Sequence, residues 1–450
     1  MKKKEGFGSK IGFVLAAAGS AVGLGNIWRF PYLAAKYGGG IFLLIYLILT
    51  VTFGFALMVT EIALGRKTGK SVIGAYKQAD ERFSFLGFFA SAVPIIIEPY
   101  YCVIGGWTLK YFLTFISSSY ISAANDDYFS KFTSEVTQPT AFFLIFALAS
   151  ITIVMIGVQK GIEAVSKFMM PLLIVISIVI AIYTMTRPGA IDGLKFYFLP
   201  NVEGFTAGTL LKTIIAAVGQ IFFSLSVAMG IMVTYGSYMK KEFSIKKSAR
   251  QIEFFDTMIA FLAGMTIVPA VFIFSGGNAA AINAGPGLMF VTLPKVFASM
   301  RGGQAIGILF FALVFLAALT SSVSLLETIV SILLEKFKLT RIPATLYASI
   351  IILIFGMLSV FGYSIWSEFT IAGYQFLDFF DFISNNILMP IVALLTCILF
   401  GYFTKTDYVI SEMEANGEHF KGKKMYTIMI KYICPICMII ILLVPFFVKF

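Results

Sequence analysis

Apolar runs long enough to cross a lipid bilayer recur along the whole chain. A helix that crosses the hydrocarbon core needs about 20 predominantly apolar residues, and about eleven segments meet that requirement. Their approximate bounds are 11–36, 40–66, 84–118, 140–158, 162–185, 207–238, 252–275, 304–334, 342–363, 371–402 and 426–448. The sequence therefore predicts an all-α polytopic membrane protein.

The amino-acid composition supports the same class. Hydrophobic residues make up 59% of the 450 residues and charged residues only 13%, whereas a soluble domain carries about 25% charged residues. The apolar runs are continuous rather than alternating, which disfavours a transmembrane β-barrel. We expect one transmembrane domain over residues 1–450, with no cleavable signal peptide, in the plasma (inner) membrane.

The basic residues indicate how the chain is oriented. Cytoplasmic loops of membrane proteins carry an excess of Lys and Arg. With the amino terminus inside, the cytoplasmic basic residues are Lys2, Lys3, Lys4, Lys10, Arg66, Lys67, Lys70, Lys240, Lys241, Lys246, Lys247, Arg250, Lys336, Lys338, Arg341, Lys421, Lys423 and Lys424. An odd number of spans then places the carboxyl terminus outside. The net charge of +11 reflects this bias and does not indicate nucleic-acid binding.

The first apolar segment contains more glycine than an ordinary membrane helix. Gly19, Gly23 and Gly25 lie within seven residues, and Asn26 and Arg29 follow directly. Glycine has no Cβ, so a helix unwinds most easily at glycine residues. A helix in hydrocarbon breaks only where its freed backbone groups find new hydrogen-bond partners. A broken helix that carries an amide and a guanidinium predicts a site for ions and a small polar solute near mid-membrane.

A second interruption is expected in the sixth segment. Residues 222–230 combine Ser224, Ser226 and Gly230 at a membrane centre. Broken helices in corresponding positions of two halves indicate an inverted repeat. We predict a 5+5 arrangement with repeats at about 11–185 and 207–402 and an extra helix at about 426–448. The alternative is that both segments are packing interfaces of small residues.

The residues do not favour an enzyme or a channel. The only histidine, His419, lies in a polar loop, and no cluster with metal or triad spacing is evident. Cys434 and Cys437 have a C-x-x-C spacing inside the last apolar segment, where redox or metal chemistry is not expected. A channel would need a repeated polar stripe along its helices, and the sequence shows none. A further hypothesis is that the intramembrane carboxylate of Glu98, beside Pro99, reaches a polar end of an aromatic substrate.

Three separate motifs resemble the neurotransmitter:sodium symporter family, which has the LeuT-type fold. They are residues 19–31 with Gly38-Gly39-Gly40, residues 219–226 (Gly-Gln-Ile-Phe-Phe-Ser-Leu-Ser) and residues 319–322 (Leu-Thr-Ser-Ser). The resemblance runs through the first ten segments. It implies sodium-coupled uptake by alternating access, with substrate and two sodium ions bound between helices one, three, six and eight.

Carried over by position, the resemblance implies two sets of oxygen ligands for sodium. The first set is Ala21, Asn26, Ser224 and Asp256. The second set is Gly19, Val22, Ala317, Thr320 and Ser321. Hydroxyl, amide and unwound carbonyl oxygens suit this hard cation. For the Thr320–Ser322 hydroxyls, the alternative is that they bond back to their own helix.

The same resemblance places the substrate against the two breaks. The implied binding residues are Ser20, Ala21, Gly23, Gly25, Ile97, Tyr101, Phe223, Ser224, Ser226, Met229, Ser321 and Leu325. Free amides near the first break hold a carboxylate, as helix starts hold anions. Gly23 stands where amine-carrying members have aspartate, which favours a substrate with its own carboxylate. The apolar wall predicts a hydrophobic or aromatic L-amino acid.

Chloride-dependent relatives use a group that corresponds to Tyr46, Gln220, Ser224 and Asp256. Here Asp256 replaces the usual asparagine, so a fixed carboxylate supplies the negative charge that chloride supplies elsewhere. We therefore expect transport that is independent of chloride. If Asp256 is protonated after sodium leaves, a proton would be counter-transported.

The resemblance also implies two gates. Arg29 and Asp381 would close the outer side, since the planar fork of arginine binds a carboxylate directly or through water. Lys4 and Glu335 would close the inner side, where the family usually has arginine and aspartate, and Phe7 stands in place of a tryptophan. Snorkelling of the outer charges to the interface is the alternative.

The sequence thus predicts a sodium-coupled symporter for hydrophobic or aromatic amino acids rather than an enzyme. Its expected partners are the amino-acid substrate, sodium ions and the lipid bilayer, with no nucleic acid and no obligatory protein partner. The alternative is a sodium-independent amino-acid exchanger of the same fold, which would lack the oxygens of Thr320 and Ser321.

Overall fold

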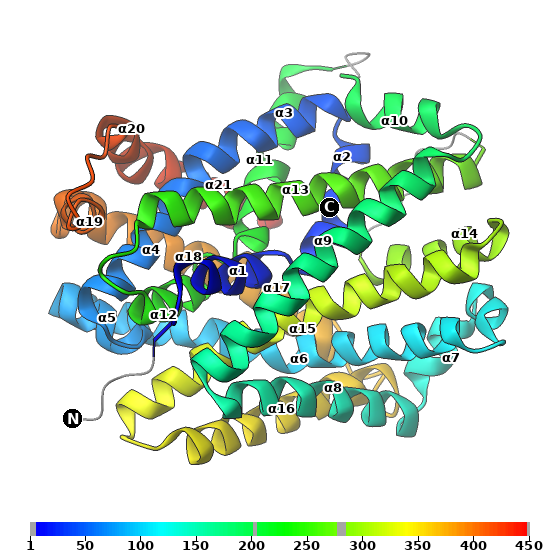
Figure 1. Ribbon diagram of the computed structural model, residues 1–450, viewed down its shortest axis with the longest axis horizontal. Helices are drawn as coiled ribbons and strands as arrows, with labels where there is room; N and C mark the ends of the chain where they lie inside the picture. Colours follow the sequence, from blue (N-terminus) through cyan, green and yellow to red (C-terminus); the bar gives the residue numbers. More distant parts are fainter. Residues whose placement is uncertain (1–5, 201–204, 277–284, 448–450) are drawn as a thin grey trace.

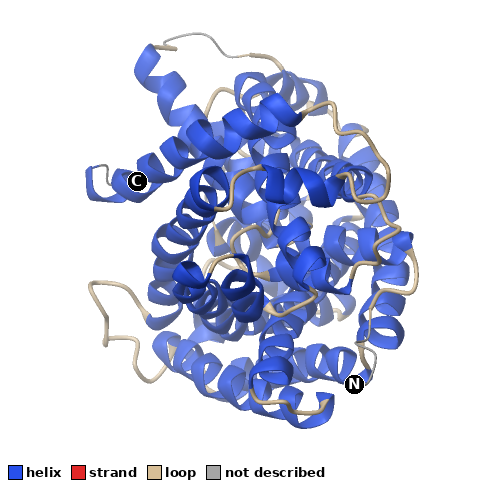
Figure 2. Ribbon diagram, turned by 90° about the vertical axis from the view of Figure 1, so that its left-hand side faces the viewer, coloured by secondary structure: helices blue, strands red, loops and turns tan. Residues whose placement is uncertain are grey.

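The computed structural model describes residues 6–200, 205–276 and 285–447, and this part of the chain is helical apart from loops and turns (Figure 2). Ten helical segments in it, Ala207–Ser224 among them, are long and apolar enough to cross a membrane. An eleventh span consists of residues Lys10–Ala21 and Gly25–Lys36, which are bent by 50° at the break between them. The predicted all-α class and the number of spans are confirmed.

The spans coincide closely with the predicted segments, and several include π-helical turns. In chain order they are α1 (Lys10–Ala21) with η1 (Gly25–Arg29) and α2 (Phe30–Lys36); α3 (Gly40–Leu49) with η2 (Thr50–Gly54) and α4 (Phe55–Thr68); α6 (Ser84–Ile116); α8 (Thr137–Ile156); η5 (Val158–Glu163) with α9 (Ala164–Met185); α11 (Ala207–Ser224) with α12 (Ile231–Tyr238); α13 (Ile245–Phe274); α15 (Gly303–Lys336); α16 (Arg341–Tyr363); α17 (Phe376–Phe382) with η8 (Ile383–Leu388), α18 (Met389–Ile398) and η9 (Leu399–Phe403); and α20 (Lys423–Ile428) with η10 (Met429–Ile433) and α21 (Cys434–Phe447).

Shorter helices connect these spans. They are α5 (Val72–Ala79), η3 (Glu81–Phe83), η4 (Tyr120–Ala124), α7 (Tyr128–Ser134), α10 (Ala190–Phe198), η7 (Leu288–Thr292), α14 (Leu293–Ser299) and α19 (Asp407–Met413). Between the described residues, β-pairing is limited to two isolated bridges, Gly39 with Pro200 and Ile371 with Tyr374.

The broken first span lies at the centre of the molecule. α1 packs against α9, α13 and α15 (Figure 1), and its consecutive alanines, Ala16, Ala17 and Ala18, are all buried. Small residues let helix backbones approach closely in a membrane protein. At Gly19 the approach is so close that an added Cβ would lie 3.2 Å from Cβ of Thr320 on α15.

The outer helices present apolar side chains away from the protein. Leu148 on α8 and Phe168 and Val175 on α9 are more than half exposed. A soluble protein rarely leaves extended apolar surface uncovered, so these faces are the ones that contact lipid. Polar side chains gather instead between the helices, where α6 packs along α15 and α8.

Candidate functional site

The first span loses its regular winding at residues 22–24, between α1 and η1. The amide of Gly23 donates to Asn26 Oδ1 at 3.2 Å, and the amide of Leu24 donates to the Tyr101 hydroxyl at 3.3 Å. The freed groups therefore have partners inside the protein, as hydrocarbon surroundings require. The predicted break at this glycine-rich segment is confirmed.

The second predicted break lies between α11 and α12. The backbone is left-handed at Ser226 (φ 52°), Ala228 (φ 60°) and Gly230 (φ 73°), and such conformations in residues other than glycine are found mainly at functional sites. Glu61 on α4 accepts a hydrogen bond from the Ala228 amide at 2.6 Å. A carboxylate inside the protein thus satisfies part of the unwound backbone.

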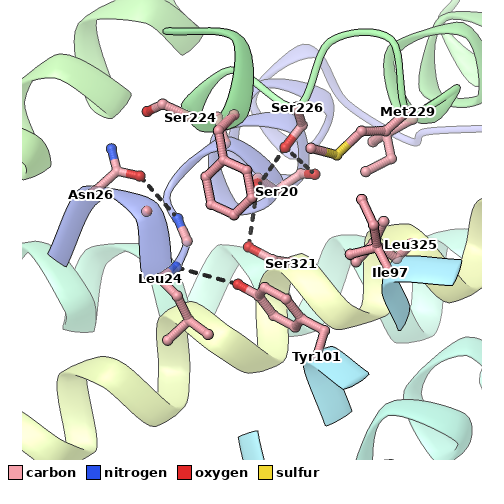
Figure 3. Close-up of a pocket in the computed structure, with 15 residues that line it drawn as sticks. Ser20, Leu24, Asn26, Ile97, Tyr101, Ser224, Ser226, Met229, Ser321 and Leu325 are labelled. Atoms are coloured by element: carbon pink, nitrogen blue, oxygen red, sulfur yellow. Dashed lines mark hydrogen bonds between the residues drawn. The ribbon is translucent and has the colours of Figure 1, made fainter. Parts of the chain in front are cut away.

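The two breaks contact each other through serine side chains (Figure 3). Ser226 Oγ donates to the carbonyl of Ser20 at 2.9 Å, and Ser321 Oγ on α15 donates to the same carbonyl at 3.0 Å. A small cavity opens beside these contacts. It is lined by Ser20, Ala21, Gly23, Leu24, Gly25, Asn26, Ile97, Tyr101, Phe223, Ser224, Ser226, Met229, Ile231, Ser321 and Leu325.

All twelve predicted substrate-binding residues line this one cavity, although they come from four separate spans. The sequence analysis did not assign Leu24, Asn26 and Ile231 to it. The lining divides into two ends. Tyr101, Ser321 and the first break form a polar end, whereas Ile97, Met229 and Leu325 form an apolar end (Figure 3).

Three polar side chains meet around the carboxylate of Asp256, which is fully buried on α13. Its Oδ1 accepts from Asn26 Nδ2 and from Ser224 Oγ, each at 2.7 Å, and its Oδ2 accepts from the Tyr46 hydroxyl at 3.2 Å. Gln220, the remaining member of the predicted chloride-equivalent group, donates to the carbonyl of Gly25, next to Asn26 in the chain, at 3.1 Å, while its Oε1 has no partner among the described residues. The structure thus brings together the side chains of the first predicted ligand set and those of the predicted chloride-equivalent group.

The second predicted ligand set lies where α1 meets α15. Ser321 Oγ lies 3.4 Å from the carbonyl of Gly19, whereas Thr320 Oγ1 donates within its own helix to the carbonyls of Leu316 and Ala317, each at 3.1 Å. Thr320 thus bonds back to its own helix, which was the alternative considered for these hydroxyls. Ser321 instead bonds across to the first span.

In the described part of the chain, the two predicted outer-gate residues, Arg29 and Asp381, do not form a direct ion pair. The guanidinium of Arg29 lies over the Phe223 ring, 5.8 Å from its centroid, and the charge of Asp381 acts on it without contact. Asp381 instead accepts from Tyr100 at 3.1 Å and from Asn385 at 2.6 Å. A direct Arg29–Asp381 contact would need a further approach of these elements.

Only one of the two predicted inner-gate residues, Glu335, can be described, because Lys4 lies outside the described residues. Glu335 at the end of α15 accepts from the Ser71 amide at 2.5 Å, at the start of α5. Phe7 is completely buried and contacts the rings of Tyr235 and Tyr238 edge-on. The phenylalanine therefore fixes the amino-terminal segment to α12, although the family usually has tryptophan there.

Glu163 on η5 holds the amino-terminal segment through contacts that the sequence analysis missed. It accepts from the Gly8 amide at 2.6 Å, from Ser9 Oγ at 2.8 Å and from Lys167 Nζ at 2.7 Å. The i,i+4 spacing of Glu163 and Lys167 was the only local signal in the sequence, and it gives no indication of the contact with residues about 155 positions earlier.

Comparisons with known proteins agree with this arrangement. The sequence profile of the sodium:neurotransmitter symporter family matches residues 4–129 and 128–450. A sodium-dependent transporter of Bacillus subtilis, YhdH, is 35% identical over 449 residues, which cover 98% of each chain. The human sodium- and chloride-dependent GABA transporter 2 is 25% identical over 473 residues, which cover 91% of this chain and 76% of the transporter.

A solved structure resembles this chain over nearly its full length. The crystal structure of MhsT in complex with L-phenylalanine is similar with a TM-score of 0.86 and 36% sequence identity, covering 98% of this chain and 99% of the other. The likeness includes the whole helical domain, so the LeuT-type arrangement with two interrupted helices applies to this chain.

Proposed function

Because the chain belongs to the sodium:neurotransmitter symporter family and is a sodium-coupled symporter of a small solute, we propose that its substrate is a hydrophobic or aromatic L-amino acid. The observation that carries this proposal is the cavity between the two helix breaks, which is polar at one end and apolar at the other. An α-amino acid with a large side chain has the same division.

The polar end suits a substrate carboxylate because Gly23 has no side chain to fill it. A Cβ on this residue would lie 2.9 Å from Ser321 Oγ and 3.0 Å from the Tyr101 hydroxyl. A side chain at this position would therefore occupy the space between two hydrogen-bond donors. In the proposal the substrate carboxylate occupies that space, and the amides of the first break and the Tyr101 hydroxyl bind it.

The apolar end suits a bulky side chain. Ile97, Met229, Ile231 and Leu325 line it, with Phe223 above the first break. Methionine adapts to different shapes, which favours a range of hydrophobic substrates over a single one. The solved relative MhsT was crystallised with L-phenylalanine, which supports the same substrate class for this chain.

The site around Asp256 supports sodium binding without chloride. A fixed carboxylate beside Ser224 and Tyr46 supplies a negative charge next to the first ion position, and three hydrogen-bond donors stabilise its ionised form. In the proposal, the first sodium ion replaces part of these hydrogen bonds and binds Asn26 Oδ1, Ser224 Oγ, Asp256 and the Ala21 carbonyl. The same site would also allow Asp256 to bind a proton after sodium has left.

A second sodium ion is proposed between α1 and α15. Its ligands would be the carbonyls of Gly19, Val22 and Ala317 and the hydroxyls of Thr320 and Ser321. Thr320 would have to exchange its intrahelical hydrogen bonds for the ion. Sodium at this position would hold α1 against α15, and the reciprocal coupling of binding sites would then raise substrate affinity.

Alternating access would follow from movement of the half-helices at the two breaks. We place the two repeats at about 11–185 and 207–402, the amino terminus in the cytoplasm and the carboxyl terminus outside, as the basic residues favour. Approach of Arg29 to Asp381 would close the outer side above Phe223, and Glu335 with Lys4 would close the inner side.

Uptake into proteoliposomes tests the proposal. A panel of labelled amino acids is offered with inward sodium or potassium gradients and with chloride or gluconate as the anion. We expect sodium-driven uptake of leucine, tyrosine or tryptophan ahead of glycine and alanine, unchanged in gluconate. A ranking led by glycine or alanine would refute the substrate class, and uptake lost in gluconate would refute chloride independence. Exchange without sodium would instead support the amino-acid exchanger.

A further inference from the structure

Glu98 is a membrane-buried carboxyl group that the proposed transport cycle does not use. It lies on α6 beside the cavity residue Ile97 and is fully enclosed by protein. Its Oε1 accepts from Ser322 Oγ on α15 at 2.6 Å and from the Cys102 thiol at 3.1 Å. Its Oε2 has no hydrogen-bond partner among the described residues.

No cation accompanies this carboxyl group in the described chain. The helices α15 and α8 contribute only hydroxyl groups here, those of Ser322 and of Ser150, which lie 2.7 Å apart. Glu98 acts electrostatically on Cys102 and Tyr101, both on α6 and neither of them cationic. By contrast, the buried Glu327 on α15 pairs with Arg341 at 2.7 Å.

Burying an isolated ionised carboxylate in such surroundings is costly unless a positive charge lies nearby. A metal cation needs several oxygen ligands and room to hold them. Glu98 does not line the cavity, and the nearby Ser322 and Ser150 hydroxyls already bond to each other. A proton on Oε2 removes the charge and needs no set of coordinating oxygens.

We propose that Glu98 is a proton-binding site and that its proton is released when sodium binds between α1 and α15. This inference rests on the second sodium position of the proposed function. The O–H bond at Oε2 breaks, its electron pair stays on the carboxylate, and the proton passes to the bulk solution. No other reactant is needed.

Ser322 provides the link between the two sites. It follows Ser321 directly, and Ser321 Oγ donates to the carbonyls of Gly19 and Ser20, at 3.4 and 3.0 Å. Sodium bound at these oxygens brings a positive charge close to Ser322 and Glu98. A nearby positive charge favours the ionised form of a carboxyl group, and by reciprocity a proton on Glu98 weakens sodium binding.

Proton release can be measured directly with the purified full-length protein in weakly buffered detergent solution. Sodium chloride or potassium chloride is added at equal ionic strength while a pH-indicator dye is monitored over a series of starting pH values. We expect sodium, but not potassium, to release up to about one proton per wild-type molecule at the pH where Glu98 is protonated before sodium is added. Absence of release over the whole pH series would overturn the proposal.

Glu98→Gln keeps the shape of the neutral acid and removes the exchangeable proton. We expect this variant to release no proton on sodium addition, yet to keep sodium-dependent binding of a labelled amino acid. Glu414→Gln, in the loop between α19 and α20, is the matched control and should release as many protons as wild type. Release that persists in Glu98→Gln would assign the proton to another group and overturn the proposal.

Ser322→Ala provides a test that leaves every carboxyl group in place. The substitution removes a hydrogen bond that favours ionised Glu98, so the pH at which sodium releases the proton should rise. An unchanged pH dependence would contradict the proposed site even if Glu98→Gln cannot be purified. Loss of sodium-dependent amino-acid binding in the wild type would instead count against the proposed function.

Discussion

Ser226 in the second helix break donates a hydrogen bond to the carbonyl oxygen of Ser20 in the first span, with 2.9 Å between the two oxygens. The same carbonyl accepts from Ser321 on α15 at 3.0 Å. One freed peptide oxygen therefore joins three spans at the cavity. Because these contacts involve few atoms, the binding of an ion or a carboxylate beside them can change the relative positions of all three spans.

Gly23→Asp should abolish amino-acid binding. The introduced carboxylate would fill the space between Ser321 Oγ and the Tyr101 hydroxyl, in which an added Cβ alone lies 2.9–3.0 Å from these oxygens. It would also place a second negative charge where the substrate carboxylate binds. A like-charge contact of this kind weakens binding by several kcal/mol, which corresponds to more than about a hundredfold in affinity. Equilibrium binding of labelled leucine or phenylalanine measures the effect.

Gly287→Asp is the matched control for this substitution. Apart from its own chain neighbours, no atom of the described residues lies within 4 Å of a Cβ added at Gly287, so the same change of residue should leave binding unaltered. If Gly23→Asp retained wild-type affinity, the carboxylate of the substrate would have to bind elsewhere in the cavity.

Asp256→Asn should make sodium binding weaker and transport sensitive to chloride. The substitution keeps the size of the side chain and removes the negative charge that accepts from Asn26, Ser224 and Tyr46. A hydrogen bond to a charged group contributes about 1.5–3 kcal/mol, so the sodium concentration for half-maximal binding should rise about tenfold or more. Addition of chloride should restore part of the affinity.

The readout is sodium-dependent binding of a labelled amino acid in chloride and in gluconate. Wild type should give the same sodium curve in both anions. A variant whose sodium curve matches that of wild type in gluconate would contradict the role assigned to Asp256.

The spans and both breaks were predictable because they depend on local composition. A run of about 20 apolar residues specifies a membrane helix, and Gly23 and Gly25 identify where the first one unwinds. The cavity residues were found through motif resemblance, since Ile97 and Leu325 have no feature of their own that separates them from core residues. Leu24 and Ile231 were missed for the same reason.

Individual side-chain pairings between distant segments were harder to predict. Whether Arg29 touches Asp381 depends on side-chain positions that the sequence does not specify, and in the structure Tyr100 and Asn385 bind Asp381 instead. Likewise, nothing near Glu98 in the sequence indicated that Ser322 on α15 would be its hydrogen-bond partner. These pairings arise from packing between helices and not from local pattern.

Arg66→Met should reduce thermal stability strongly. Arg66 and Glu412 form an ion pair at 2.7 Å whose side chains are only 1% and 5% exposed, and Arg66 also donates to the carbonyl of Phe243. Loss of one partner of a buried pair lowers the free energy of unfolding by about 3–5 kcal/mol. Lys241 lies 3.3 Å from Glu412 but is 68% exposed, so it replaces only part of the interaction.

The midpoint of thermal unfolding in detergent measures this effect. Arg66→Met/Glu412→Met should recover part of the lost stability, because no buried charge is left without a partner. Arg82→Met is the control: Arg82 pairs with Asp80 but its side chain is 68% exposed, so this variant should leave the midpoint unchanged. Equal midpoints for Arg66→Met and wild type would show that this ion pair does not stabilise the fold.

Glu163→Gln should release the amino-terminal segment from η5. The carboxylate of Glu163 accepts from the Gly8 amide at 2.6 Å and from Ser9 Oγ at 2.8 Å, and a neutral amide makes a weaker bond to the same donors. Charge-assisted hydrogen bonds contribute about 1.5–3 kcal/mol, so hydrogen–deuterium exchange at Gly8 should accelerate about tenfold. Lys167→Met is the control: it removes the neighbouring cation, leaves both of these hydrogen bonds in place and should change the exchange rate much less. An exchange rate in Glu163→Gln equal to that of wild type would mean that the burial of Phe7 alone holds the segment.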